Sequence, residues 1–201
     1  MSRITAFADQ VKADSDAFRR TFPRDEEIVS SVLLAAEDRR GRDHHGIDWI
    51  SLLRAMVQFP IRGHLRGIST IEQQYARTVF PRRGSVVLCK LRELALVRRA
   101  TSRVSKEDVW LGYLWRAYFG HQQNGYAQAR RALINDDESL DVERAVRIVA
   151  FLKYPKPSQS NERWRLRYKQ RVKHIRRCIR DSRVQICLSY LGSSGSETSR
   201  T

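Results

Sequence analysis

The sequence predicts an all-α fold in a single domain. Apolar side chains recur with helical spacing along nearly the whole chain of 201 residues. No stretch of useful length alternates apolar and polar residues as a half-buried strand would, and no internal repeat is present. The length and the 41% hydrophobic content are sufficient for one domain with a substantial core.

The first predicted helices have recognisable beginnings and ends. One covers residues 25–40, because it follows Pro23 and carries acidic residues in its first turn, where the helix dipole favours them. Asp48 is placed to cap a second helix that runs through Phe59 and ends at Pro60. The later helices are expected at residues 69–78, 86–102, 105–119, 125–134, 139–153 and 161–190.

Two of the later helices begin with capping residues. Ser69, followed three residues later by Glu72, forms a capping box, and Ser105 with Asp108 caps the helix that follows. A helix start needs Ser69 and Glu72 whether or not a substrate binds there. Their spacing alone therefore does not establish a binding site.

The chain divides into an N-terminal extension (residues 1–24), a main domain (residues 25–190) and a tail (residues 191–201). The tail is rich in serine and glycine and is expected to be disordered. Three cysteines occur at irregular spacing. We interpret them as core thiols that form neither a disulfide framework nor a metal site.

The net charge of +16 favours anionic partners, whether nucleic acid, acidic lipid headgroups or phosphorylated substrates. The longest apolar run, residues 28–36, is about half as long as a membrane span. Residues 1–22 lack the apolar centre of a signal peptide. We therefore expect no signal peptide and no transmembrane helix in this chain.

Two glutamates stand where apolar residues are expected. Glu37 continues the helical stripe that begins at Val29, and Glu93 interrupts the stripe of residues 86–100. A carboxylate on such a face loses part of its water, which suits proton transfer. Other interpretations stay open: Glu37 can end its helix and face solvent, and both acids can form core salt bridges.

Several polar motifs surround these glutamates. Residues 36–48 read AEDRRGRDHHGID, and residues 67–74 read GISTIEQQ. Both segments combine small, amide and charged side chains, which can bind a polar substrate. Further along the chain, residues 89–93 read CKLRE, residues 106–115 read KEDVWLGYLW and residues 152–158 read LKYPKPS.

In this order, the segments resemble the signatures of the family 51 glycosyltransferases, the peptidoglycan polymerases found alone or fused to penicillin-binding transpeptidases. The resemblance covers roughly residues 28–180 and implies a lysozyme-like, two-lobed helical domain. The matching positions in the first two signatures are Glu37, Asp38, His44, His45, Gly46, Ser69, Thr70, Gln73, Gln74 and Arg77. The departures from the family pattern are Gly41, Glu72, Cys89 and Trp115.

The resemblance also implies roles for individual residues. Glu37 is the general base that deprotonates the 4-hydroxyl of the acceptor sugar. Glu93 assists at the donor. There it stabilises the positive charge that develops on the donor sugar and helps to hold the diphosphate, directly or through a divalent ion. The transfer is expected to invert the anomeric configuration, with no required cofactor and no predicted metal site. The residues expected to bind substrate are Asp38, Ser69, Thr70, Gln73, Gln74, Arg77, Lys90 and Arg116.

The implied substrates are lipid II and the growing glycan strand, at the outer face of the bacterial cytoplasmic membrane. Residues 49–59 form an apolar segment that Arg54 interrupts. This segment resembles the start of the family's membrane-dipping lobe, although a buried helix explains it equally well. The other expected partners are an anionic membrane surface and a transpeptidase or other protein of cell-wall synthesis.

Two other functions remain open from the sequence. A degenerate relative that binds lipid-linked precursor or a polymerase partner without catalysis would explain the four departures, above all the added charge of Glu72. A basic nucleic-acid-binding protein would explain the Arg- and Lys-rich residues 163–183. It would not explain the ordered glutamates or the GISTIEQQ segment, so nucleic acid is not the expected partner.

Overall fold

The computed structural model describes residues 2–62, 69–81, 84–135 and 138–181. It confirms the all-α prediction, with one short hairpin as the exception. The helices are α1 (Arg3–Thr21), α2 (Glu26–Glu37), α3 (Trp49–Arg62), α4 (Ile71–Val79), α5 (Val86–Ala100), α6 (Lys106–Arg116), α7 (Tyr126–Arg131), α8 (Val142–Lys153) and α9 (Glu162–Asp181), and the strands are β1 (Tyr118–Gly120) and β2 (Gln123–Asn124).

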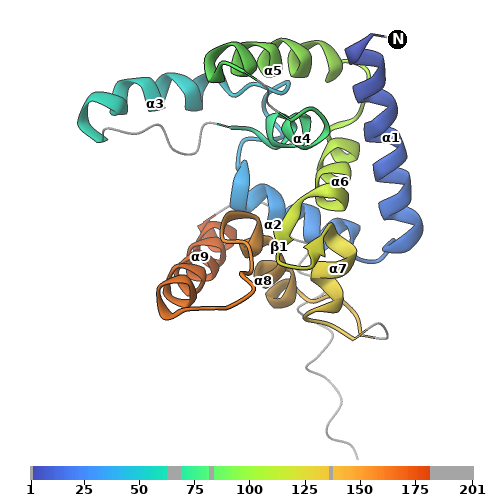
Figure 1. Ribbon diagram of the computed structural model, residues 1–201, viewed down its shortest axis with the longest axis vertical. Helices are drawn as coiled ribbons and strands as arrows, with labels where there is room; N and C mark the ends of the chain where they lie inside the picture. The colour runs from blue at the N-terminus through green and yellow to red at the C-terminus, as the bar shows by residue number, and fades with distance from the viewer. Residues whose placement is uncertain (1, 63–68, 82–83, 136–137, 182–201) are drawn as a thin grey trace, which may run out of the picture.

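The helices form two lobes, as expected for a lysozyme-like domain (Figure 1). One lobe contains α3, α4 and α5, and the other contains α2, α7, α8 and α9. The helices α1 and α6 lie side by side and connect the lobes, with α6 also packing on α4 and α2. Glu37 at the end of α2 and residues 69–74 at the start of α4 therefore meet where the two lobes join.

Helix α1 is part of the hydrophobic core. Its residues Phe7, Val11 and Phe18 are fully buried against the rest of the domain. Residues 1–24, expected as an N-terminal extension, thus contribute a helix that packs along α6. The tail at residues 191–201 lies outside the described residues.

Several predicted boundaries move by a few residues. Thr70 rather than Ser69 caps α4, because the Thr70 hydroxyl accepts the hydrogen bond from the Gln73 backbone N–H. The predicted capping box is therefore wrong, and Glu72 is buried in the core instead. Helix α3 continues two residues past Pro60. By contrast, Asp48 accepts hydrogen bonds from the first backbone N–H groups of α3, as predicted.

The predicted helix over residues 105–119 is too long, because α6 ends at Arg116 and the chain enters β1. Gly120 ends this strand at a φ of +142°, and its backbone pairs with that of Lys156. A Cβ atom at Gly120 would lie 2.3 Å from the Lys156 backbone nitrogen. The sequence alone gave no sign of this close approach between two loops.

We expect Gly120→Ala to destabilise the domain by about 2–4 kcal/mol, since it adds both backbone strain and a backbone clash. Gly84→Ala is the matched control: its φ is +91°, but a Cβ there would meet nothing within 4 Å. That variant should lose only about 1 kcal/mol. Urea unfolding of the two variants measures the difference, and equal losses would contradict the clash.

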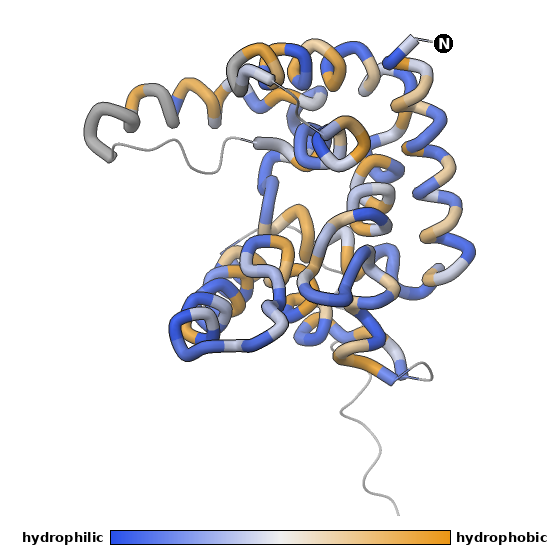
Figure 2. The backbone as a smooth tube through the Cα atoms, viewed as in Figure 1, coloured by the Kyte–Doolittle hydropathy of each residue, from blue (hydrophilic) through white to orange (hydrophobic). Residues whose placement is uncertain are grey.

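Helix α9 closes the second lobe through its apolar stripe. Val172 and Ile175 are buried, and Trp164 stacks with Tyr168 and Phe151 of α8. The rest of α9 is strongly hydrophilic, whereas α3 carries hydrophobic residues on a helix that projects from the body (Figure 2). Within the described ranges, no helix combines the length and the apolar content that crossing a membrane would require.

Candidate active site

Glu37 is the last residue of α2, and two side chains from distant segments bind its carboxylate. Gln74 donates from Nε2 to Glu37 Oε2 at 3.1 Å, and Arg171 donates from Nη2 to Glu37 Oε1 at 2.5 Å. Tyr113 donates its hydroxyl to Gln74 Oε1 at 2.9 Å, which fixes the orientation of that amide. Burial and the charge of Glu37 raise the pKa of Tyr113, so it stays a donor. The Glu37 carboxylate is thereby held in one position with 12% of its side chain exposed.

Glu37 lines a pocket of about 270 Å³ whose wall is rich in cations. The pocket also contains Ser69 and Thr70, at the N-terminus of α4. A carboxylate beside positive charges and a helix N-terminus can act as a base next to a bound anion. The basic residues of this wall are Arg39, Arg40, Arg54, Lys153 and Arg171.

Glu93 lies in a second polar cluster, between α4 and α5. It accepts hydrogen bonds from Lys90 at 2.8 Å and from Arg77 Nη2 at 3.2 Å. Burial on its own would raise the pKa of Glu93, but the hydrogen bonds and charges of Arg77 and Lys90 lower it below its ordinary value. Glu93 is therefore an ionised group that suits charge stabilisation better than proton transfer.

Lys90 connects this cluster to the start of α4. Its ammonium group donates to Gln73 Oε1 at 2.5 Å and to Ser69 Oγ at 3.4 Å, as well as to Glu93. The structure thus brings Lys90, Ser69, Gln73, Arg77 and Glu93 together, as the motifs predicted.

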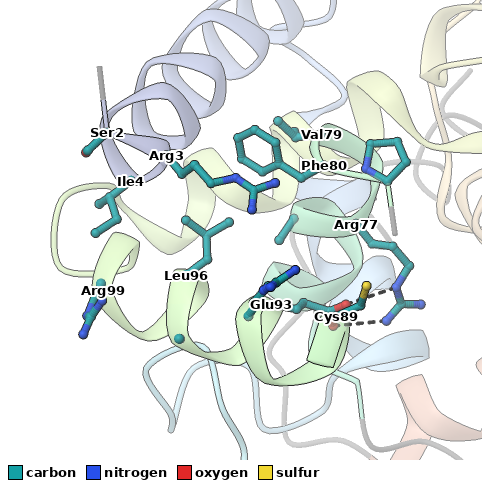
Figure 3. Close-up of a pocket in the computed structure, with 14 residues that line it drawn as sticks. Ser2, Arg3, Ile4, Arg77, Val79, Phe80, Cys89, Glu93, Leu96 and Arg99 are labelled. Atoms are coloured by element: carbon teal, nitrogen blue, oxygen red, sulfur yellow. Dashed lines mark hydrogen bonds and ion pairs between the residues drawn. The ribbon is translucent and has the colours of Figure 1, made fainter. Parts of the chain in front are cut away.

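Among the described residues, the two glutamates line different pockets. Glu93 faces a different pocket, of about 570 Å³, formed by the start of α1, the end of α4 and α5 (Figure 3). The side chains of α4 separate the two carboxylates, with Gln74 bound to Glu37 and Arg77 bound to Glu93. The resemblance gives both acids a role in one transfer reaction, yet they line separate pockets, and both form the salt bridges that the sequence had left as an alternative.

The segment after α2 is tied to the start of α4. The Thr70 hydroxyl and Gln73 Nε2 both donate to the backbone carbonyl of Gly46, at 2.8 and 3.2 Å. Thr70 and Gln73 are 2% exposed. These predicted substrate-binding residues therefore hold the loop that follows Glu37, and of the two only Thr70 lines the pocket at Glu37.

Asp38 is buried and lies beside His44 and Glu72. Its carboxylate lies 3.0 Å from His44 Nε2, and the three residues each offer a ligand atom within 4.8 Å of the other two. Burial raises the pKa of Glu72, and the negative charge of Asp38 raises it further. Burial alone would lower the pKa of His44, but the hydrogen bond and charge of Asp38 raise it. Oxygen and imidazole ligands in this arrangement are able to hold a metal ion.

Arg116 lies apart from both glutamates. It pairs with Asp14 of α1, which also accepts a hydrogen bond from the Tyr75 hydroxyl at 2.7 Å. This contact fastens α1 to α4 and α6. The structure therefore does not bring Arg116 together with the other predicted substrate-binding residues.

Arg171 and Tyr113 were missed as site residues by the sequence analysis. Tyr113 belonged to a recognised motif, but nothing in the spacing placed it beside Gln74. Arg171 is one of many basic residues on α9, and only the packing of that helix on α2 and α8 shows that it reaches Glu37. Lys153 at the end of α8 also lines the pocket and carried no separate signal.

Comparison with known proteins shows the family of this chain. A family profile described as "Transglycosylase" matches residues 11–179. Penicillin-binding protein 1A of Neisseria lactamica is 29% identical over 148 residues, which cover 71% of this chain and 18% of the relative. Penicillin-binding protein 1F of Bacillus subtilis is 32% identical over 129 residues, covering 63% of this chain and 18% of the relative.

Penicillin-binding protein 1A of Haemophilus influenzae is 35% identical over 99 residues, or 49% of this chain and 12% of the relative. The chain spans less than a fifth of the length of each of these three relatives. The family profile nevertheless matches far more than half of this chain. The chain therefore belongs to the transglycosylase family, the peptidoglycan glycosyltransferases of which its motifs and its two-lobed helical fold are typical.

Proposed function

We propose that this chain polymerises lipid II into glycan strands by inverting transfer, with Glu37 as the general base. The observation that carries the proposal is the position of Glu37 in a pocket whose wall holds five basic residues and the N-terminus of α4. A diphosphate-linked sugar needs a base on one side of the reacting carbon and positive charge on the other. The pocket supplies both kinds of group.

Glu37 is held in place for proton transfer. Its carboxylate would accept the proton of the acceptor's 4-hydroxyl while that oxygen bonds to the anomeric carbon of the donor. The bond from that carbon to the diphosphate breaks, and the lipid diphosphate leaves with the electron pair. A single displacement of this kind inverts the anomeric configuration. Gln74 and Arg171 hold the carboxylate from two directions, which limits its rotation.

The departing diphosphate requires positive charge and hydrogen-bond donors. Arg39, Arg54 and Lys153 line the pocket at Glu37, and the N-terminus of α4 adds the partial positive charge of a helix dipole. We propose that these groups bind the diphosphate. Asp38 acts beside them as a positioning residue, because it is buried against His44.

Glu93 acts through Lys90 in this proposal. Lys90 contacts both Glu93 and Ser69, and Ser69 lines the pocket that contains Glu37. An ionised Glu93 keeps the ammonium group at the edge of that pocket. Its assistance at the donor is therefore that of a positioning residue, with Arg77 as its second partner.

The exposed face of α3 fits a membrane surface. Trp49, Ile50, Leu53 and Val57 are each at least half exposed, which argues against the buried-helix interpretation. Apolar side chains on a projecting helix, with Arg54 among them, suit an anionic headgroup layer. We propose that the chain works at the outer face of the cytoplasmic membrane, beside a transpeptidase or another protein of cell-wall synthesis.

The direct test is polymerisation of lipid II by the purified chain in detergent and in anionic vesicles. We expect glycan strands whose length increases with time. If lipid II binds but no polymer forms under any condition, the proposal fails. That result would support the degenerate binding relative, for which the ion pairs of Glu37 and Glu93 are the favouring observation.

Arg171→Gln should slow turnover more than it weakens substrate binding. The change removes the cation that holds the Glu37 carboxylate in place, so we expect kcat on lipid II to fall about tenfold while KM changes less. Steady-state kinetics on lipid II provide both constants. Arg176→Gln, on the same helix but paired with Glu143 outside this pocket, is the matched control. Equal effects of the two variants would show that only the general charge of α9 matters.

A further inference from the structure

We propose that Asp38, His44 and Glu72 form a binding site for one divalent transition-metal ion, which clamps the loop after α2 to helix α4. One of the three ligands, Glu72, stands where the family pattern has threonine.

The first observation is the geometry of the ligands. Two carboxylates and one imidazole each offer an atom within 4.8 Å of the other two, and all three side chains are buried. Ligand atoms around a bound zinc ion are about 3–4 Å apart, because each lies about 2 Å from the metal. Side-chain adjustments of about 1 Å therefore suffice to close the site.

The second, independent observation is that Glu72 lacks partners. It is 0% exposed, and among the described residues neither of its carboxylate oxygens has a hydrogen-bond partner. The Thr70 hydroxyl and the Glu72 backbone N–H are near, but they do not make a hydrogen bond of acceptable geometry. His44 Nδ1 is also buried without a partner among these residues. Buried polar groups are almost always satisfied, so this cluster requires another group to complete it.

A divalent cation would balance the charge of this cluster and would also fit its geometry. Asp38 and Glu72 together carry two negative charges, and His44 binds metals in its neutral form. A mixed oxygen and nitrogen set with three ligands is typical of zinc and its neighbours in the first transition row. Magnesium requires near-ideal octahedral coordination and keeps several waters, which a buried three-ligand site does not provide.

The position of the site would allow a bound ion to connect the end of α2 to the start of α4. Asp38 directly follows Glu37, and Glu72 directly precedes Gln73 and Gln74. A metal between them would fix the separation of α2 and α4 next to the Gln74–Glu37 hydrogen bond. Asp38 also lines the pocket at Glu37, which gives an ion a route to its ligands.

The test is metal binding by the full chain after treatment with a chelator. We expect one Zn²⁺ per chain by calorimetry, a visible absorption spectrum with Co²⁺ as the probe, and a rise in Tm with Zn²⁺ that Mg²⁺ does not produce. Glu72→Gln keeps the size of the side chain and removes its charge. It should weaken Zn²⁺ binding by at least about tenfold.

Two controls keep the test decisive. His45→Gln removes an exposed histidine next to His44 and should leave Zn²⁺ affinity unchanged, whereas His44→Gln should weaken it. Equal affinity of Glu72→Gln and the unaltered chain, or the absence of saturable one-to-one binding, would overturn the proposal. The proposal would also be overturned if Zn²⁺ did not change the stability of the unaltered chain and Glu72→Gln were more stable than that chain. Those results would show that the buried cluster holds a proton rather than a metal ion.

Discussion

Glu37→Gln is expected to lower lipid II polymerisation by about a thousandfold or more, within the range that loss of a general base produces. Glutamine has nearly the same shape as glutamate, but it cannot accept the proton of the acceptor hydroxyl. The loss should lie in kcat, because the diphosphate-binding cations of the pocket remain. A time course of glycan-strand formation at saturating lipid II measures this effect.

Control measurements distinguish a loss of catalysis from a loss of folding. Glu143→Gln changes an acid on α8 that pairs with Arg176, outside the pocket, and should polymerise at the unaltered rate. Binding of lipid II and the Tm of Glu37→Gln should both stay near those of the unaltered chain. Polymerisation by Glu37→Gln at the unaltered rate would remove Glu37 from the mechanism and leave the chain without an identified base.

The largest expected loss of stability follows from Asp25→Ala. Asp25 accepts hydrogen bonds from Arg130 Nε at 2.7 Å and from the Tyr126 hydroxyl at 2.8 Å, and both Asp25 and Arg130 are buried. Removing the carboxylate leaves a buried guanidinium without its charge partner. A loss of about 3–5 kcal/mol in the free energy of unfolding is expected, measured by urea denaturation.

A double variant tests this explanation. Asp25→Ala combined with Arg130→Met removes both charges and should regain part of the stability lost in Asp25→Ala. The exposed pair of Glu143 and Arg147 provides the control, since Glu143→Ala should change stability little. If the double variant is less stable than Asp25→Ala, the cost comes from lost packing rather than from the unpaired charge.

Much of the fold could be predicted from local signals. Asp48 caps α3 and Ser105 caps α6, because a side-chain oxygen placed before a helix satisfies its first backbone N–H groups wherever the helix packs. Apolar side chains at helical spacing mark the side of α9 that faces the core, where Val172 and Ile175 are buried. Boundaries set by distant contacts were less predictable, as Gly120 shows, because the Lys156 backbone that restricts it lies far along the chain.

The site could be predicted only in part, for the same reason. The motifs identified the residues around Glu93, and the structure brings most of them together. The partners of Glu37 came from two other helices, α4 and α9, and Arg171 carried no signal beyond being one basic residue among many. Arg116 was assigned to the substrate by its neighbours in sequence, yet its side chain is directed to Asp14.

The sequence by itself determined the helical class, the motif order that shows the family, and the choice of Glu37 and Glu93 as unusual acids. These features depend on spacing along the chain, which hydrophobic periodicity and helix capping convert directly into local structure. Only the tertiary structure decided that the two acids face different pockets, that Arg171 binds Glu37, and that Glu72 is buried beside Asp38 and His44. The reason is physical: charge pairing and burial depend on which helices pack together, and residues far apart in sequence determine that packing.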